Sequence, residues 1–201
     1  MSTGTTTVSN TKSSFSTKQI ATIGICAAIS FVLMFVKFPV AYLGFLELEI
    51  SDLPAIFMTL VYGPVAGVFV ELIKNILHLA TTSTGMSGEL ANFAVSLGYV
   101  IPLGLIFHRG NGKRKLITGL GAGIIGMVIM GIIINYFVTV PLYLTLFGKD
   151  AVLGMVQAVI PSIHNVAGIV ILGITPFNIF KGLVISILAY YLYKVLKDRI
   201  A

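Results

Sequence analysis

The last apolar segment of the chain contains an amide and an ammonium group among hydrocarbon side chains. Asn178 and Lys181 lie one helical turn apart in "TPFNIFKGLVISILAYYLYKVLKDRIA". Charged and amide groups inside a membrane are costly, and they usually face a cavity or one another. The two residues therefore predict a polar site inside a membrane protein, and hydrogen bonding to a bound molecule is the chemistry that they offer.

The composition supports a membrane protein. Of the 201 residues, 57% are hydrophobic and 10% are charged, and the mean hydropathy is +1.01. Soluble domains carry about 25% charged residues. The net charge of +6 is concentrated in short basic segments, which is typical of cytoplasmic loops and does not indicate nucleic-acid binding. The single cysteine, Cys26, cannot form an internal disulfide.

The apolar segments predict an all-α membrane protein with six transmembrane helices. We place these helices at residues 20–38, 52–62, 64–80, 89–107, 116–140 and 175–196. Residues 1–18 are rich in Ser and Thr and predict a flexible cytoplasmic tail, so the membrane domain is residues 19–201. Pro141 is expected to end the fifth helix, and residues 141–174 are expected to form a long external loop or a re-entrant segment.

Three basic clusters predict the orientation of the chain in the membrane. Lys12 and Lys18 precede the first apolar segment, "HRGNGKRK" separates two later ones, and Lys197 and Arg199 follow the last. Cytoplasmic loops carry an excess of Lys and Arg. Both termini are therefore expected in the cytoplasm, which requires an even number of crossings.

With this orientation, several polar side chains are expected at one depth in the outer half of the membrane. One helix face carries Glu71, Lys74, Asn75 and His78, and Asn92, Asn135, Asn178 and Lys181 lie on three further helices. Glu47, Glu49 and Asp52 belong to the first external loop. The aromatic residues expected near these groups are Phe93, Tyr136, Phe137, Phe177 and Phe180. Together they predict a pocket in the extracellular half for a flat heteroaromatic ligand.

Other readings of these residues stay open. Glu71 and Lys74 can form an ion pair within their helix, Asn135 can bond a neighbouring helix, and Lys181 can extend to the membrane surface. Tyr143 is expected in the aromatic belt at the interface. An intramembrane enzyme using Glu71 and His78 is a different class of function, and a structural scaffold is another.

The sequence argues against a dinucleotide-binding domain and against ATP binding through a Walker motif. "GLGAGIIG" contains the Gly spacing of a dinucleotide-binding loop, but no predicted strand precedes it, so its glycines predict close helix packing. The chain contains no Walker motif for ATP. A pocket without an energy source indicates a binding subunit that depends on a partner.

Four blocks resemble the riboflavin-specific substrate-binding (S) components of energy-coupling factor (ECF) transporters. They are "ELEISDLPAIFMTLVYGPVAGVFVELIKNILH", "GELANF", "NYFVTVP" and "TPFNIFKG", and the likeness runs from about Ile20 to the C-terminus. The resemblance implies a multi-pass protein of a prokaryotic cell membrane that is not an enzyme. It implies riboflavin, or its phosphate FMN, as the transported substrate. The implied partners are a transmembrane coupling (T) subunit, two ATP-binding subunits and the lipid bilayer. A different vitamin remains the alternative substrate.

The resemblance also implies which residues bind the ligand. Asn135, Asn178 and Lys181 would contact the flavin, joined by an acidic residue of the first loop that Glu49 matches best. We add Glu47, Asn92, Phe137 and Phe177 to the expected site. The family docks on the T subunit through Ala-x-x-x-Ala in its first helix. This chain lacks that motif, and the nearest small-residue face is formed by Ala21, Gly24 and Ala28.

Overall fold

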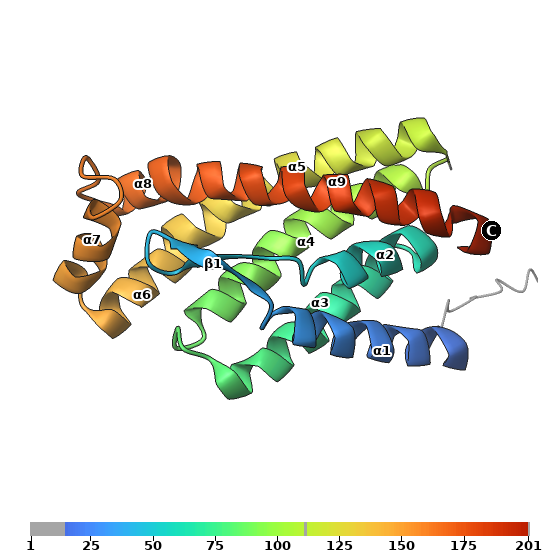
Figure 1. The fold of residues 1–201 in the computed structure, drawn as a ribbon, viewed down its shortest axis with the longest axis horizontal. Coiled ribbons are helices and arrows are strands. Elements are labelled where there is room, and N and C mark those ends of the chain that lie inside the picture. Colours follow the sequence, from blue (N-terminus) through green and yellow to red (C-terminus); the bar gives the residue numbers. More distant parts are fainter. Residues whose placement is uncertain (1–14, 111, 201) are drawn as a thin grey trace, which may run out of the picture.

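The structure is a computed structural model that describes residues 15–110 and 112–200, and these residues are mostly helical (Figure 1). The helices of the first half are α1 (Thr17–Leu33), α2 (Leu53–Tyr62), α3 (Pro64–His78) with a 3₁₀ turn (Leu79–Thr81), and α4 (Ser87–Phe107). The second half contains α5 (Lys113–Ile134), α6 (Val140–Phe147), α7 (Lys149–Gln157), α8 (Val166–Gly168) and α9 (Thr175–Ile200). Strands β1 (Lys37–Tyr42) and β2 (Leu46–Glu49) form an antiparallel hairpin.

Four helical stretches of the described residues are long and apolar enough to cross a membrane. They are Pro64–Thr81, Ser87–Phe107, Lys113–Phe147 and Val166–Val195. Helices α1 and α2 are apolar but shorter, with 17 and 10 residues. The chain is therefore a multi-pass membrane protein, and crossing by α1 and α2 stays a prediction. The predicted tail falls mainly on residues 1–14, which lie outside the described part.

The predicted helix over residues 20–38 ends earlier, at Leu33, and a β-hairpin follows it. Leu43 and Gly44 form the turn with φ of 57° and 82°. Two successive residues with positive φ are typical of a tight hairpin turn whose twist matches its strands. The first predicted loop is therefore an ordered hairpin, and it carries Glu47 and Glu49.

The segment 141–174, predicted as a long external loop or a re-entrant segment, is largely helical. A π-helical turn, Asn135–Thr139, joins α5 to α6, and a second one, Ile169–Ile174, joins α8 to α9. Each turn is followed within two residues by a proline, Pro141 or Pro176. Proline cannot donate a backbone hydrogen bond and crowds the preceding turn, and a widened turn accommodates it. The expectation that Pro141 ends the helix was therefore wrong.

Helices α4 and α5 pack closely because glycines line their contact. Gly119 lies against Leu103, Gly123 against Tyr99, and Gly126 against the backbone of Gly98. Small residues at this spacing let two helix backbones approach each other. The "GLGAGIIG" pattern thus lies inside α5 and serves packing, as the sequence indicates.

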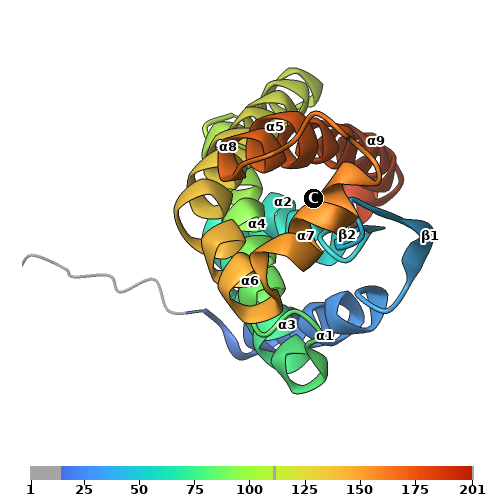
Figure 2. The ribbon, with the colours of Figure 1, turned by 90° about the vertical axis from the view of Figure 1, so that its left-hand side faces the viewer.

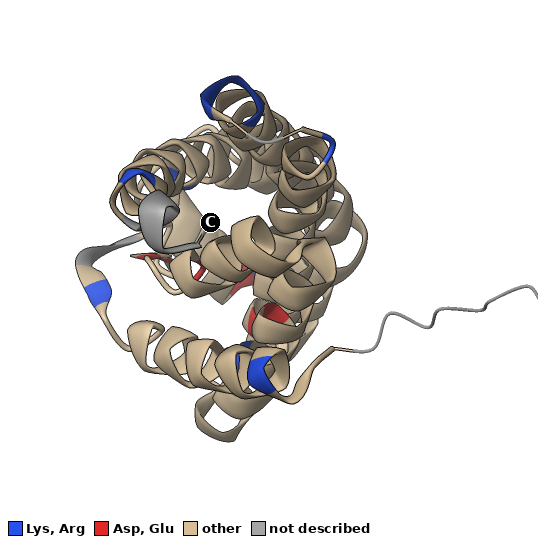
Figure 3. Cartoon of the chain, turned by 90° about the vertical axis from the view of Figure 1, so that its right-hand side faces the viewer, with Lys and Arg blue, Asp and Glu red and all other residues tan. Residues whose placement is uncertain are grey.

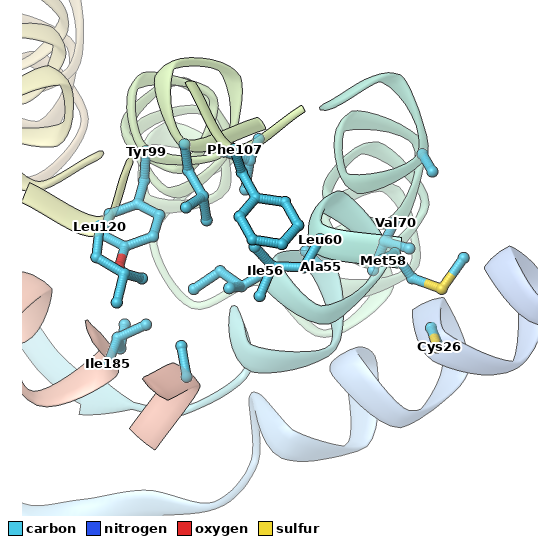
Figure 4. Packing of buried hydrophobic residues seen from close by; sticks show 14 of the residues in the cluster. Cys26, Ala55, Ile56, Met58, Leu60, Val70, Tyr99, Phe107, Leu120 and Ile185 are labelled. Carbon is cyan, nitrogen blue, oxygen red and sulfur yellow. The ribbon is translucent and has the colours of Figure 1, made fainter. Parts of the chain in front are cut away.

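Buried apolar side chains form two clusters at different levels of the bundle. The larger cluster contains residues of α1, α2, α3, α4, α5 and α9. Figure 4 shows Phe107 of α4 beside Ile56 and Leu60 of α2. The smaller one includes Leu43 of the hairpin, Val156 of α7 and Ile174 before α9. Several of the polar residues described below line a cavity.

The two ends of the bundle differ in charge. The start of α1, the α4–α5 connection and the C-terminus of α9 share one end, whereas the hairpin and α7 lie toward the other (Figure 1). Viewed from the first end, Lys and Arg segments lie at the near ends of several helices and one lies on an extended segment, whereas acidic segments lie deeper (Figure 3). The hairpin turn packs on α7, where Gly44 lies against Met155 (Figure 2).

Candidate ligand-binding site

The structure contains a cavity of about 170 Å³, lined mainly by residues of the hairpin, α4, the first π-helical turn, α6, α7 and α9, with His78 at the end of α3. Its wall is mixed, with amide, charged, hydroxyl and aromatic side chains. The lining residues used below are Lys37, Phe45, Glu47, Glu49, His78, Thr84, Glu89, Asn92, Asn135, Thr139, Tyr143, Phe177, Asn178 and Lys181. Apolar walls with a few polar groups are typical of small-molecule sites.

All but one of the residues predicted to bind the ligand line this cavity. They come from β2, α4, the first π-helical turn and α9, and they are Glu47, Glu49, Asn92, Asn135, Phe177, Asn178 and Lys181. The exception is Phe137, which is 71% exposed and does not line the cavity. Phe137 follows Asn135 by two residues on the π-helical turn, and this places the two side chains on different faces.

The aromatic lining also differs from the prediction. Phe93, Tyr136 and Phe180 are absent from the cavity wall, which instead includes Phe45 and Tyr143. The rings of Phe45 and Tyr143 lie 5.1 Å apart, so Tyr143 faces the hairpin and not the surrounding belt. Phe177 stacks on Tyr42 with ring centres 6.1 Å apart and planes inclined by 6°. This pairing fixes one flat ring at the cavity wall.

Asp52 connects two buried lysines below the cavity. Its Oδ1 lies 2.6 Å from Lys74 Nζ and accepts a hydrogen bond from Ser96 Oγ at 3.2 Å. Its Oδ2 lies 3.0 Å from Lys181 Nζ. Asp52 precedes the first residue of α2 but its side chain does not cap that helix, so the carboxylate is available to both ammonium groups.

The ion-pair network continues on both sides of Asp52. Lys74, which has no exposed surface, also pairs with Glu71 Oε2 at 2.6 Å, so the ion pair within α3 is present. On the cavity side, Lys181 Nζ lies 3.3 Å from Glu49 Oε1. Glu49 Oε1 also accepts a hydrogen bond from Asn92 at 2.8 Å. Buried charges are stable only when paired in this way.

Helix α1 is tied to this network through its last turns. The Ser30 hydroxyl donates a hydrogen bond to the carbonyl of Ser51, the residue before Asp52. Ser51 Oγ in turn accepts from Lys74 Nζ at 3.1 Å. The segment that carries Asp52 is therefore fixed by both α1 and α3.

Two asparagines complete the wall, and they differ in how they are satisfied. Asn135 donates through Nδ2 to the carbonyl of Gly131 at 2.8 Å, and its Oδ1 accepts from Thr139 Oγ1 at 2.7 Å. Asn178 is 6% exposed and lines the cavity. No described residue makes a side-chain hydrogen bond with it. A buried amide normally has partners, so the Asn178 amide is available to a bound molecule.

The connection between α3 and α4 is organised around Glu89. Glu89 Oε1 lies 2.8 Å from His78 Nδ1, and Oε2 accepts from Thr82 at 2.9 Å and Thr84 at 3.1 Å. His78 is therefore engaged with Glu89, while Glu71 is paired with Lys74. The described residues contain no group of His, Cys, Asp and Glu suited to hold a metal ion.

Sequence reasoning missed Asp52 and Thr139 as members of the site. Asp52 was counted with the external loop, although its position before an apolar helix too short to span the membrane was a usable signal. Because α2 has 10 residues, its start lies inside the bundle rather than at the surface. Thr139 was also missed, although it follows Asn135 by four residues, a spacing that brings two side chains together on one face of a helix.

Comparison with known proteins identifies the family. Residues 18–193 match the family model described as the substrate-specific component of ECF transporters. The chain is 38% identical to the riboflavin transporter RibU of Staphylococcus aureus, covering 90% of this chain and 91% of that protein. It is 32% identical to the riboflavin transporter FmnP of Bacillus subtilis, covering 91% and 94%.

A solved structure has the same fold. It is described as the S component of a bacterial ECF transporter, and it superposes with a TM-score of 0.69 at 37% sequence identity. The alignment covers 90% of this chain and 96% of that one. These are transporter components and not enzymes. The chain therefore belongs to the substrate-specific (S) components of ECF transporters.

Proposed function

We propose that this protein binds riboflavin from outside the cell and delivers it to the cytoplasm as the S component of an ECF transporter. The curated relatives at 38% and 32% identity are named as riboflavin transporters over nearly their whole length. The cavity residues Asn135, Asn178 and Lys181, which the family resemblance links to the flavin, come from two helices and meet in one wall.

The buried amide of Asn178 is the observation that carries this proposal. The pyrimidine edge of the isoalloxazine ring presents two carbonyls and an N–H, which require both donors and acceptors. An asparagine supplies both, and Asn135 retains one N–H and one lone pair beyond its contacts with Gly131 and Thr139. Lys181 has three N–H groups and two carboxylate partners, so one N–H remains to donate to the ligand.

The rest of the wall suits the remaining parts of the vitamin. Phe45, Tyr143 and Phe177 offer flat surfaces for the ring system. Glu49, Asn92 and Thr84 offer acceptors for the ribityl hydroxyls. This division of apolar faces and polar edges matches a flat ring carrying a polyhydroxyl chain.

We further propose six crossings of the cell membrane, with both termini in the cytoplasm and the cavity in the extracellular half. Lys18, Lys113, Arg114 and Lys115 lie at the start of α1 and of α5, at the end of the bundle away from the hairpin. An excess of basic residues marks the cytoplasmic side. The cavity is lined by residues of the hairpin and α7, at the opposite end, and this supports a position in the extracellular half.

Transport requires energy that this chain does not supply. The family resemblance implies that a T subunit and two ATP-binding subunits supply this energy. It also implies that the S component tilts in the membrane and so releases the vitamin inward. The candidate docking face on α1 contains Ala21, Gly24 and Ala28, and all three are exposed. A Cβ at Gly24 would meet nothing within 4 Å in the described structure. The face is therefore open to close approach by another helix.

Riboflavin titration of the purified protein tests the proposed binding. We expect saturable quenching of flavin fluorescence, and Asn178→Ala should weaken binding by roughly 1–3 kcal/mol, since flavin groups in the complex would lose their partner. Phe137→Ala is the control, because its side chain lies outside the cavity. Wild-type affinity in Asn178→Ala would reject this site, and saturable binding of thiamine or biotin instead would assign a different vitamin.

Substitution in α1 tests the docking face separately. Gly24→Leu should lower recovery of the T subunit with the S component at least tenfold, because the larger side chain separates the two helices. Riboflavin affinity should stay unchanged. Gly121→Leu is the matched control, since Gly121 is an exposed glycine of α5 with nothing within 4 Å of its Cβ position. Equal recovery of the partner with both variants would place the docking site elsewhere.

A further inference from the structure

Gly131 of α5 lies behind the cavity wall and contacts both asparagines of the site. It is buried, it does not line the cavity, and its carbonyl accepts the hydrogen bond from Asn135 Nδ2 at 2.8 Å. Thr139 donates to the other end of the same amide at 2.7 Å. The two contacts fix the orientation of the Asn135 amide, with Nδ2 toward the Gly131 carbonyl and Oδ1 toward the Thr139 hydroxyl.

The second asparagine reaches the same glycine from α9. A methyl group at position 131 would overlap Asn178 Nδ2, whereas the nearest atom of any other residue, Val95 Cγ2, would be 3.7 Å away. That distance is ordinary van der Waals contact. A methyl group at Gly131 would therefore displace one neighbour, the Asn178 amide, and would not crowd the helices in general.

We propose that Gly131 is a positioning residue of the ligand site, which seats the amides of Asn135 and Asn178 side by side. Its carbonyl orients the first amide and its missing side chain makes room for the second. The arrangement presents adjacent donors and acceptors from two helices, which suits a ligand edge of alternating carbonyl and N–H groups. The identity of that ligand as riboflavin rests on the proposed function, whereas the seating of Asn178 does not.

A four-member set of proteins tests this role: the wild type, Gly131→Ala, Asn178→Ala and the double variant. We expect Gly131→Ala to weaken riboflavin binding at least tenfold in the wild-type background, because the methyl group displaces the Asn178 amide. In the Asn178→Ala background the same change should alter affinity less than twofold. Such dependence on background measures the coupling between the two positions.

Thermal unfolding of the same four proteins without ligand provides a second readout. Gly131→Ala should lower the midpoint in the wild-type background relative to Gly121→Ala, which controls for the helix preference of alanine at an open position of α5. In the Asn178→Ala background this difference should disappear. The unfolding data decide the seating even if Asn178→Ala removes all measurable binding.

The outcomes separate this inference from the proposed function. Equal losses of affinity and midpoint from Gly131→Ala in both backgrounds would show a clash with something other than Asn178 and would overturn the inference. Unchanged affinity and midpoint in the wild-type background would also overturn it. Absence of riboflavin binding by the wild type, together with a background-dependent midpoint, would reject the vitamin while supporting the seating.

Discussion

Asp52→Asn should remove most of the ligand affinity and a large part of the stability of this protein. The substitution removes the carboxylate that Lys74 and Lys181 share. Each buried lysine then keeps a single carboxylate partner, Glu71 for Lys74 and Glu49 for Lys181. Removing one partner of a buried ion pair costs about 3–5 kcal/mol. Lys181 would also lose the contact that holds its ammonium group at the cavity. Chemical unfolding in detergent and riboflavin titration measure the two effects.

Two carboxylates at exposed positions provide controls for this prediction. Asp150 on α7 is exposed, and Glu47 forms a partly exposed pair with Lys37 at 2.5 Å. Exposed ion pairs contribute about 0–1 kcal/mol, so Asp150→Asn and Glu47→Gln should unfold close to the wild type. If Asp52→Asn unfolds like these controls, the buried network does not hold the helices together.

Gly126→Ala should separate α4 from α5 and destabilise the bundle. A methyl group there would overlap the carbonyl group of Gly98, and a backbone cannot rotate away as a side chain does. Overpacking of this kind costs about 1–3 kcal/mol and occasionally more. Gly98→Ala should act in the same way, because its methyl group would meet the backbone of Gly126. Unfolding in detergent measures the loss.

Gly121→Ala, five residues earlier on the same helix, is the matched control. Its Cβ position is open, so the variant should be as stable as the wild type or slightly more stable. Equal stability of the Gly126 and Gly121 variants would mean that the two helices do not pack through their glycines.

The sequence predicted the helices better than their ends. Apolar segments located a helix at each of the six expected places, because burial in lipid requires continuous apolar residues. The predicted helix ends near Pro141 and Pro176 were wrong, because a π-helical turn before each proline lets the helix continue. The hairpin after α1 was not predicted, because the apolar segment continues to Phe38 and the residues around Glu47 and Glu49 were assigned to an external loop.

The site was predicted from the polar residues whose burial in a membrane costs the most free energy. Asn178 and Lys181 were recognisable because an amide and a charge inside an apolar segment require a partner or a cavity. Side-chain direction was harder to infer. Phe137 was placed at the cavity by nearness to Asn135 along the chain, and the widened turn directs it outward. Asp52 was missed because its role depends on Lys74 and Lys181, which are distant in sequence.

The absorption spectrum of the protein purified from riboflavin-supplied cells tests the central claim most directly. If Asn135, Asn178 and Lys181 enclose the vitamin, the purified protein should be yellow, with the flavin bands at one flavin per chain. Asn178→Ala should carry much less flavin after the same washing. A colourless wild-type protein that also fails to quench added riboflavin would contradict the claim that this cavity is a riboflavin site.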